Sequence, residues 1–270
     1  MVFWDLKLIS AKMSATMSAT KSAKKTIQTA VQKVAHCRLK ALETPGLSKA
    51  VSDIKAFQSK RFTATYQDLL HMPQYKPATQ FFLEELYSEK DYTQRDDQFS
   101  RIAGTLERMF PQQVVQTAVS LAQLHSLTED LDLAMAQCWL KLSKKENEIK
   151  EKEIERYIAA WLKVGRRADR EAQLSGALRV GQELVTLTQT PGLRMALKLM
   201  RKPATLAGMA ALQQFLESGF DTFAAMTPKN KTKKPKNAQS QTNVEGSAFF
   251  LETVQQREAE LIERLFKGIL

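Results

Sequence analysis

The sequence is poor in the residues that interrupt helices. Its 270 residues include only 10 glycines and 8 prolines, and because these residues punctuate turns, their scarcity excludes a sheet protein with many tight turns. Hydrophobic residues make up 43% of the chain, which is enough for a sizeable core. We therefore expect an all-α protein with a single, bundle-like domain of roughly eight to ten helices.

Cysteine and long apolar runs are also scarce. Cys37 and Cys138 are the two cysteines, and no CxxC motif joins them, so we expect free thiols in a reducing cytoplasm. The sequence has no run of about 20 apolar residues, so no transmembrane segment is expected. Asp5 and Lys7 interrupt the apolar N-terminal patch, which argues against a signal peptide.

Only three histidines are present, and this limits metal and cofactor chemistry. His125 and Glu129 are four residues apart on one predicted helix face, but two ligands are too few for a structural zinc site. Di-iron motifs, glycine-rich phosphate loops and nucleophile elbows are absent. We predict no metal, no cofactor and no catalytic residue, and an enzyme or small-ligand binder with an interhelical pocket stays an alternative.

The net charge of +11 is unevenly distributed. Residues 1–60 carry +8, residues 227–243 carry +5, and the rest of the chain carries −2. This distribution indicates basic arms attached to a near-neutral body. Arg166, Arg167 and Arg170 form a further basic cluster and are candidates for phosphate contact. Nucleic-acid association through the basic segments is therefore a second hypothesis, and solvated charge is the alternative.

Helical periodicity and turn residues divide the chain into four parts. Residues 1–20 are expected to form a flexible extension, with a short, loosely docked helix or a membrane-surface anchor as alternatives. Residues 21–227 are expected to form the helical domain, residues 228–244 a disordered lysine-rich insertion, and residues 245–270 the final helix of the same domain. The expected helices cover residues 21–42, 48–70, 77–87, 93–110, 111–142, 154–165, 168–188, 193–200, 203–223 and 249–266.

The most informative segment is Phe81–Tyr87, which reads Phe-Phe-Leu-Glu-Glu-Leu-Tyr. On a helical wheel the aromatic and aliphatic side chains fill most of the circumference, and Glu84 lies on the polar side. Glu85 falls at about 40° from Phe81, on the apolar side. A carboxylate there needs a partner, a raised pKa or a path to water.

The next predicted helix supplies a partner for that carboxylate. Thr93 is its expected N-cap, and Arg95 and Asp96 lie one turn before its apolar stripe. A short connection favours antiparallel neighbours. We predict that Arg95 reaches Glu85 or Glu84, either as a structural tie or as part of a site that also includes Tyr87 and Asp96.

These residues carry a resemblance to a known family. The segment 81–87, followed by Asp91-Tyr92 and Arg95-Asp96, resembles the signature of the FFLEELY-motif proteins of bacteria. Further residues fit the same pattern: Phe57-Gln58, Arg61-Phe62, Thr65-Tyr66, Asp68-Leu69-Leu70, Leu131-Asp132, Met200-Arg201-Lys202-Pro203-Ala204, Phe215-Leu216-Glu217, Gly219-Phe220 and Arg257-Glu258. The resemblance covers roughly residues 30–268 and implies an all-helical bacterial protein, without implying an activity or a cofactor. Residues 1–20 and 228–244 depart from the pattern.

The leading functional hypothesis is a non-enzymatic, cytoplasmic binding or interaction protein. Its site would lie at the corner formed by Glu84, Glu85, Tyr87, Arg95 and Asp96. The expected partner is another protein.

Overall fold

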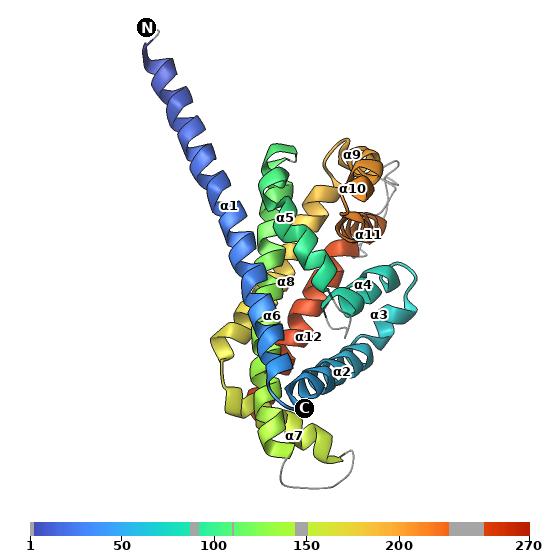
Figure 1. Ribbon diagram of the computed structural model, residues 1–270. Coiled ribbons are helices and arrows are strands. Elements are labelled where there is room, and N and C mark those ends of the chain that lie inside the picture. The colour runs from blue at the N-terminus through green and yellow to red at the C-terminus, as the bar shows by residue number, and fades with distance from the viewer. Residues whose placement is uncertain (1–2, 87–91, 110, 144–150, 227–245) are drawn as a thin grey trace, which may run out of the picture.

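The computed structural model describes residues 3–86, 92–109, 111–143, 151–226 and 246–270 (Figure 1). These residues form 12 helices and no strand, so the prediction of an all-α, multi-helix protein is confirmed. The helices outnumber the ten expected elements because two of these, at residues 48–70 and 203–223, are each divided into two helices. The helices are α1 (Phe3–Glu43), α2 (Leu47–Thr65), α3 (Gln67–His71), α4 (Lys76–Leu86), α5 (Thr93–Met109), α6 (Gln112–Ser143), α7 (Glu151–Val164), α8 (Arg167–Thr188), α9 (Leu193–Leu199), α10 (Arg201–Leu206), α11 (Ala210–Met226) and α12 (Gly246–Phe266).

Helix α6 is the central element. It packs against α1, α2, α7 and α8, and Leu131, Met135 and Ala136 on it are fully buried. A helix surrounded by other helices needs apolar residues around most of its circumference, and the predicted helix at residues 111–142 has that character. The fold is therefore a set of helices arranged around one long axis (Figure 1).

Helix α1 extends further toward the N-terminus than the predicted domain boundary. It is continuous from Phe3 to Glu43 over 41 residues, so residues 3–20 form the first half of one long helix and not a short separate one. Figure 1 shows that this half of α1 projects beyond the other helices. The expected insertion at residues 228–244 lies outside the described residues.

Two Pro-Gly pairs, Pro45-Gly46 and Pro191-Gly192, separate helices at places where one expected helix ends and the next begins. Gly46 has a φ of 78° between α1 and α2, and Gly192 has a φ of 76° before α9. Positive φ suits glycine because a side chain would clash with the backbone. Both turns therefore follow from the sequence.

Two predicted helices are interrupted in the structure. Residues 203–223 are divided into α10 and α11, and the other interrupted helix is the one predicted at residues 48–70. It is divided into α2 and α3 at Tyr66, which has a φ of −114°. Tyr66 is fully buried, and its hydroxyl donates to Glu258 at 3.0 Å. Arg257 donates to the Thr65 carbonyl at 2.7 Å. The interruption is therefore stabilised by α12, which is almost 200 residues away.

Helix α12 belongs to the same packed body as the N-terminal half. Ile262 and Leu265 share a core cluster with Ile54 of α2, and Phe250 shares another with Phe62. Within the described ranges, no helix combines the length and apolar character that crossing a bilayer requires.

Candidate functional site

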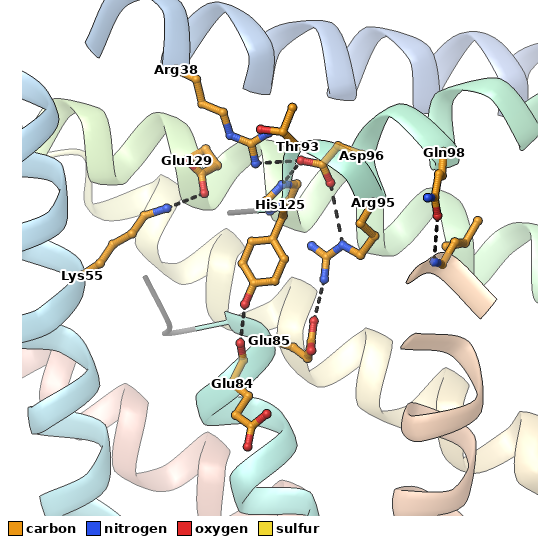
Figure 2. Close-up of polar contacts among 12 residues, drawn as sticks. Arg38, Lys55, Glu84, Glu85, Thr93, Arg95, Asp96, Gln98, His125 and Glu129 are labelled. Carbon is orange, nitrogen blue, oxygen red and sulfur yellow. Dashed lines mark hydrogen bonds and ion pairs between the residues drawn. The ribbon is translucent and has the colours of Figure 1, made fainter. Parts of the chain in front are cut away.

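The predicted contact between α4 and α5 is present. Arg95 donates through Nη1 to Oε2 of Glu85 at 2.5 Å, and the two side chains are only 14% and 20% exposed. The Arg95 guanidinium also lies over two rings, 4.0 Å from the centroid of Tyr92 and 4.9 Å from that of Phe215. The ion pair and the two cation–π contacts restrict the orientation of this arginine. The prediction that Arg95 reaches Glu85 is confirmed (Figure 2).

Asp96 forms a second set of charged contacts beside the ion pair of Arg95 and Glu85. Its Oδ2 accepts from Arg38 Nη2 at 2.7 Å and lies 3.0 Å from His125 Nε2. Arg38 comes from α1 and His125 from α6, so three helices meet at one buried carboxylate. Burial alone would raise the pKa of Asp96, but the hydrogen bond and charge of His125, with the charges of Arg38 and Arg95, hold the pKa below its ordinary value.

The ionised state of Asp96 fixes the tautomer of His125. A carboxylate without a proton can only accept hydrogen bonds. The Nε2 atom of His125 must therefore carry the proton that joins it to Asp96. This leaves Nδ1 as an acceptor whenever the imidazole is neutral.

Glu84 and Tyr87 have different places from the rest of the predicted site. The Glu84 side chain is exposed, and Figure 2 shows it pointing away from Arg95. Its backbone carbonyl accepts a hydrogen bond from the Tyr92 hydroxyl, which links the end of α4 to the start of α5. Tyr87 lies outside the described residues. The structure thus brings Glu85, Arg95 and Asp96 together and leaves Glu84 at the surface.

A second group of polar contacts, between α2 and α6, lies beside His125. Lys55 donates to Glu129 at 2.6 Å, and Gln58 donates to Asp132 at 3.1 Å. Burial raises the pKa of the Asp132 carboxyl, and the positive charge of Lys55 only partly offsets this effect. Lys55, Glu129 and Asp132 line a small cavity of about 20 Å³ together with Glu85 and His125. The polar groups of the corner therefore continue into the interior of the bundle.

His125 and Glu129 do not converge as a pair of metal ligands. His125 contacts Asp96, whereas Glu129 contacts Lys55. Within the described part of the chain, no three His, Cys, Asp or Glu side chains are grouped so as to hold a metal ion.

The charged corner forms one end of a larger cavity. The cavity has a volume of about 100 Å³, and Glu85, Arg95, Asp96 and His125 form its charged end. Its remaining walls are mainly apolar side chains from α4, α5, α6, α8, α9 and α11. They include Phe81, Phe82, Phe99, Val114, Ala118, Leu121, Ala177, Val180, Leu184, Leu193, Leu197, Phe215 and Phe220. A concave, mostly apolar space with a few convergent polar groups is the usual form of a small-molecule site.

Thr117 contributes a hydroxyl to the cavity lining. Its Oγ1 donates to the Gln113 carbonyl of the same helix at 3.1 Å, so this hydroxyl proton is already used within α6.

A family model described as "Domain of unknown function (DUF8198)" matches residues 38–232. The chain belongs to this family. The matched range includes Arg38, Glu85, Arg95, Asp96 and His125, so the charged end of the cavity lies within the DUF8198 domain. Neither the search of curated proteins nor the search of solved structures found a match.

The three arginines predicted as phosphate contacts also lie within the DUF8198 range, but they do not converge. Arg166 binds Asp130 at 2.8 Å and Asp169 at 2.6 Å. Arg167 pairs with Glu171 and Glu263. Arg170 is buried, stacks on Trp161 at 4.1 Å and donates to Gln173. Phosphate contact by these residues stays a prediction.

Two residues of the site, Arg38 and His125, were not assigned to it from the sequence. Both lie on helices distant in sequence from α5 and approach Asp96 only through the packing of α1 and α6 beside it. Their only local signal is a polar side chain on a largely apolar helix face. That signal also fits a packed core histidine or a solvated arginine.

Proposed function

We propose that this protein is a non-enzymatic binding protein for a small, neutral and largely apolar molecule. The observation that supports this proposal is the apolar cavity with its charged end of Glu85, Arg95, Asp96 and His125. The proposal keeps the predicted corner as the site and takes the interhelical pocket as the place of binding. A protein partner is not required.

The size of the cavity supports a small ligand. A cavity of about 150 Å³ lined by Leu, Ile and Phe binds benzene, and the cavity here measures about 100 Å³. A single ring or a short branched chain has a volume of that order. A long acyl chain or a nucleotide exceeds it.

The balance of charge supports a neutral ligand. When the imidazole of His125 is neutral, the carboxylates of Glu85 and Asp96 are matched by the guanidinium groups of Arg95 and Arg38. A charged ligand would add a charge without a counterpart in a buried site, which is costly. A hydroxyl can instead donate to a carboxylate and accept from a guanidinium. We therefore propose a ligand with an apolar body and one hydroxyl or similar group.

Two further proposals concern the cellular location and the bacterial family. A cytoplasmic location is supported by the free thiols of Cys37 and Cys138. The resemblance to the FFLEELY-motif proteins of bacteria stays a prediction from the sequence.

The experiment compares phenol and benzene as probes by isothermal titration calorimetry. We expect phenol to bind, benzene to bind at least tenfold more weakly, and benzoate not to bind. Ala177→Leu adds a side chain to the cavity wall and should abolish binding. Ala172→Leu is the matched control, because Ala172 is exposed on the same helix and its variant should bind phenol like the unmodified protein.

Thermal unfolding of both variants provides the check on folding. The proposal is contradicted if phenol gives no binding isotherm at two temperatures, or if the folded Ala177→Leu variant binds phenol as well as the Ala172→Leu variant does. Tighter binding of benzoate than of phenol would contradict the assignment of a neutral ligand.

A further inference from the structure

The outer face of α9 and α10 exposes large apolar side chains. Met195 is 64% exposed, Leu199 is 70% exposed and Leu206 is 89% exposed. All three lie within 12 residues of sequence. The opposite sides of the two short helices are held in place, because Leu193, Leu197 and Ala204 are buried. The exposed side chains are therefore presented on an anchored surface.

Basic residues are interspersed with these apolar side chains. Residues 189–216 contain Arg194, Lys198, Arg201 and Lys202 and no acidic residue. Arg194 pairs with Asp221, and Arg201 pairs with Glu217, so both arginines tie the segment to α11. Lys198 and Lys202 are exposed. The surface therefore combines apolar side chains with outward positive charge.

This combination fits the surface of an anionic bilayer. At a membrane interface, apolar side chains enter the boundary between headgroups and acyl chains, and lysines extend their charged ends to the lipid phosphates. A fluid bilayer accommodates separate apolar side chains one by one. A protein partner favours a contiguous apolar centre with a polar rim, whereas lysines interrupt the apolar positions here.

We propose that the outer face of α9 and α10 docks on anionic membranes. Met195, Leu199 and Leu206 would enter the interface, and Lys198 and Lys202 would bind the lipid headgroups. Figure 1 shows α9 and α10 at the periphery of the molecule, beside α11. The inner side of α9 lines the apolar cavity through Leu193 and Leu197, so docking would place one wall of the cavity next to the lipid. This proposal does not depend on the identity of the cavity ligand.

The test is co-sedimentation of the full chain with vesicles of phosphatidylcholine containing phosphatidylglycerol, compared with vesicles of phosphatidylcholine alone. We expect binding to the anionic vesicles, at least tenfold weaker binding to the neutral ones, and a loss of binding at high salt. The variant Met195→Ser/Leu199→Ser/Leu206→Ser should lose at least tenfold in affinity. Lys198→Gln/Lys202→Gln should lose roughly fivefold for each lysine.

Two control variants test whether the effect belongs to this surface. Leu39 and Leu42 of α1 are 52% and 75% exposed, and Leu39→Ser/Leu42→Ser should bind like the unmodified protein. Phe3→Ser/Trp4→Ser tests the N-terminal segment and should also retain binding.

The proposal is overturned if anionic vesicles do not sediment the protein, or if neutral vesicles bind it equally well. It is also overturned if the folded triple variant binds like the unmodified protein, or if only the Phe3→Ser/Trp4→Ser variant loses binding. Circular dichroism establishes that each variant is folded.

Discussion

At the scale of single residues, Arg95 connects the two acids of the site. It binds Glu85 directly, and its Nε lies 3.8 Å from Oδ1 of Asp96. An arginine can serve two acids because its planar guanidinium presents several donors in fixed directions. Lysine has no such fork, so it would not replace Arg95. The connection between Glu85 and Asp96 therefore depends on this one side chain.

Substitution of Glu85 tests this dependence. Glu85→Gln leaves the partly buried Arg95 charge without its closest counterpart. We expect a loss of about 2 kcal/mol in the free energy of unfolding, because breaking a buried pair is costly. Glu84→Gln, at an exposed neighbouring position, should change it by less than about 0.5 kcal/mol. Urea denaturation of both variants measures the two free energies of unfolding. Equal losses of free energy would contradict a stabilising role of the pair between Glu85 and Arg95.

The two buried aspartates should respond to pH in opposite directions. The lowered pKa of Asp96 means that its contribution to stability is present above the unfolded pKa of about 4 and is lost as the pH falls through the folded value. The raised pKa of Asp132 means that its contribution is present below about pH 4 and is lost as the pH rises through the folded value.

Asparagine substitutions at these two positions make the contrast measurable. Asp96→Asn should cost about 2 kcal/mol at pH 7, and the cost should shrink below pH 4. Asp132→Asn should become more favourable relative to the unmodified protein as the pH rises above about 4. Urea denaturation between pH 3 and pH 7 tests both trends. Parallel pH profiles for the two variants would contradict the assigned shifts.

At the scale of helices, the corner between α4 and α5 was predictable because its signals are local. Glu85 stands out on an apolar face, and Arg95 lies ten residues later at a helix start. The division of residues 48–70 at Tyr66 was not predictable, because its stabilising contacts come from Glu258 and Arg257 on α12. Proline and glycine allow helix ends to be predicted from the local sequence. An interruption that a distant helix stabilises leaves no such local signal.

Gly181 and Gly246 lie where neighbouring helices pack closely, and their substitution provides a prediction at this scale. A Cβ atom at Gly246 would lie 2.1 Å from the backbone oxygen of Met226, whereas one at Gly181 would lie 2.5 Å from the Leu251 side chain. A side chain can rotate away, but a backbone oxygen cannot move without shifting the helix. Gly246→Ala should therefore destabilise the protein by about 3 kcal/mol and Gly181→Ala by about 1 kcal/mol or less. Thermal unfolding measures both, and the reverse order would contradict this packing.

At the scale of the whole molecule, the cavity is a property of the fold. Its wall is built from α4, α5, α6, α8, α9 and α11, and no single segment of sequence contains enough of it to indicate a pocket. The apolar residues that line it are indistinguishable in sequence from ordinary core residues such as Phe62. The sequence could predict the polar corner and the helical class. It could not predict that helix packing would leave space beside that corner.

We propose that a neutral molecule occupies this space with its polar group at the charged end. A crystal structure of the protein soaked with phenol would test this placement. We expect the ring among Phe99, Leu121 and Leu184, with the hydroxyl within about 3.5 Å of Glu85, Arg95, Asp96 or His125. A ring bound elsewhere, or one in the cavity with its hydroxyl directed toward the apolar wall, would contradict it.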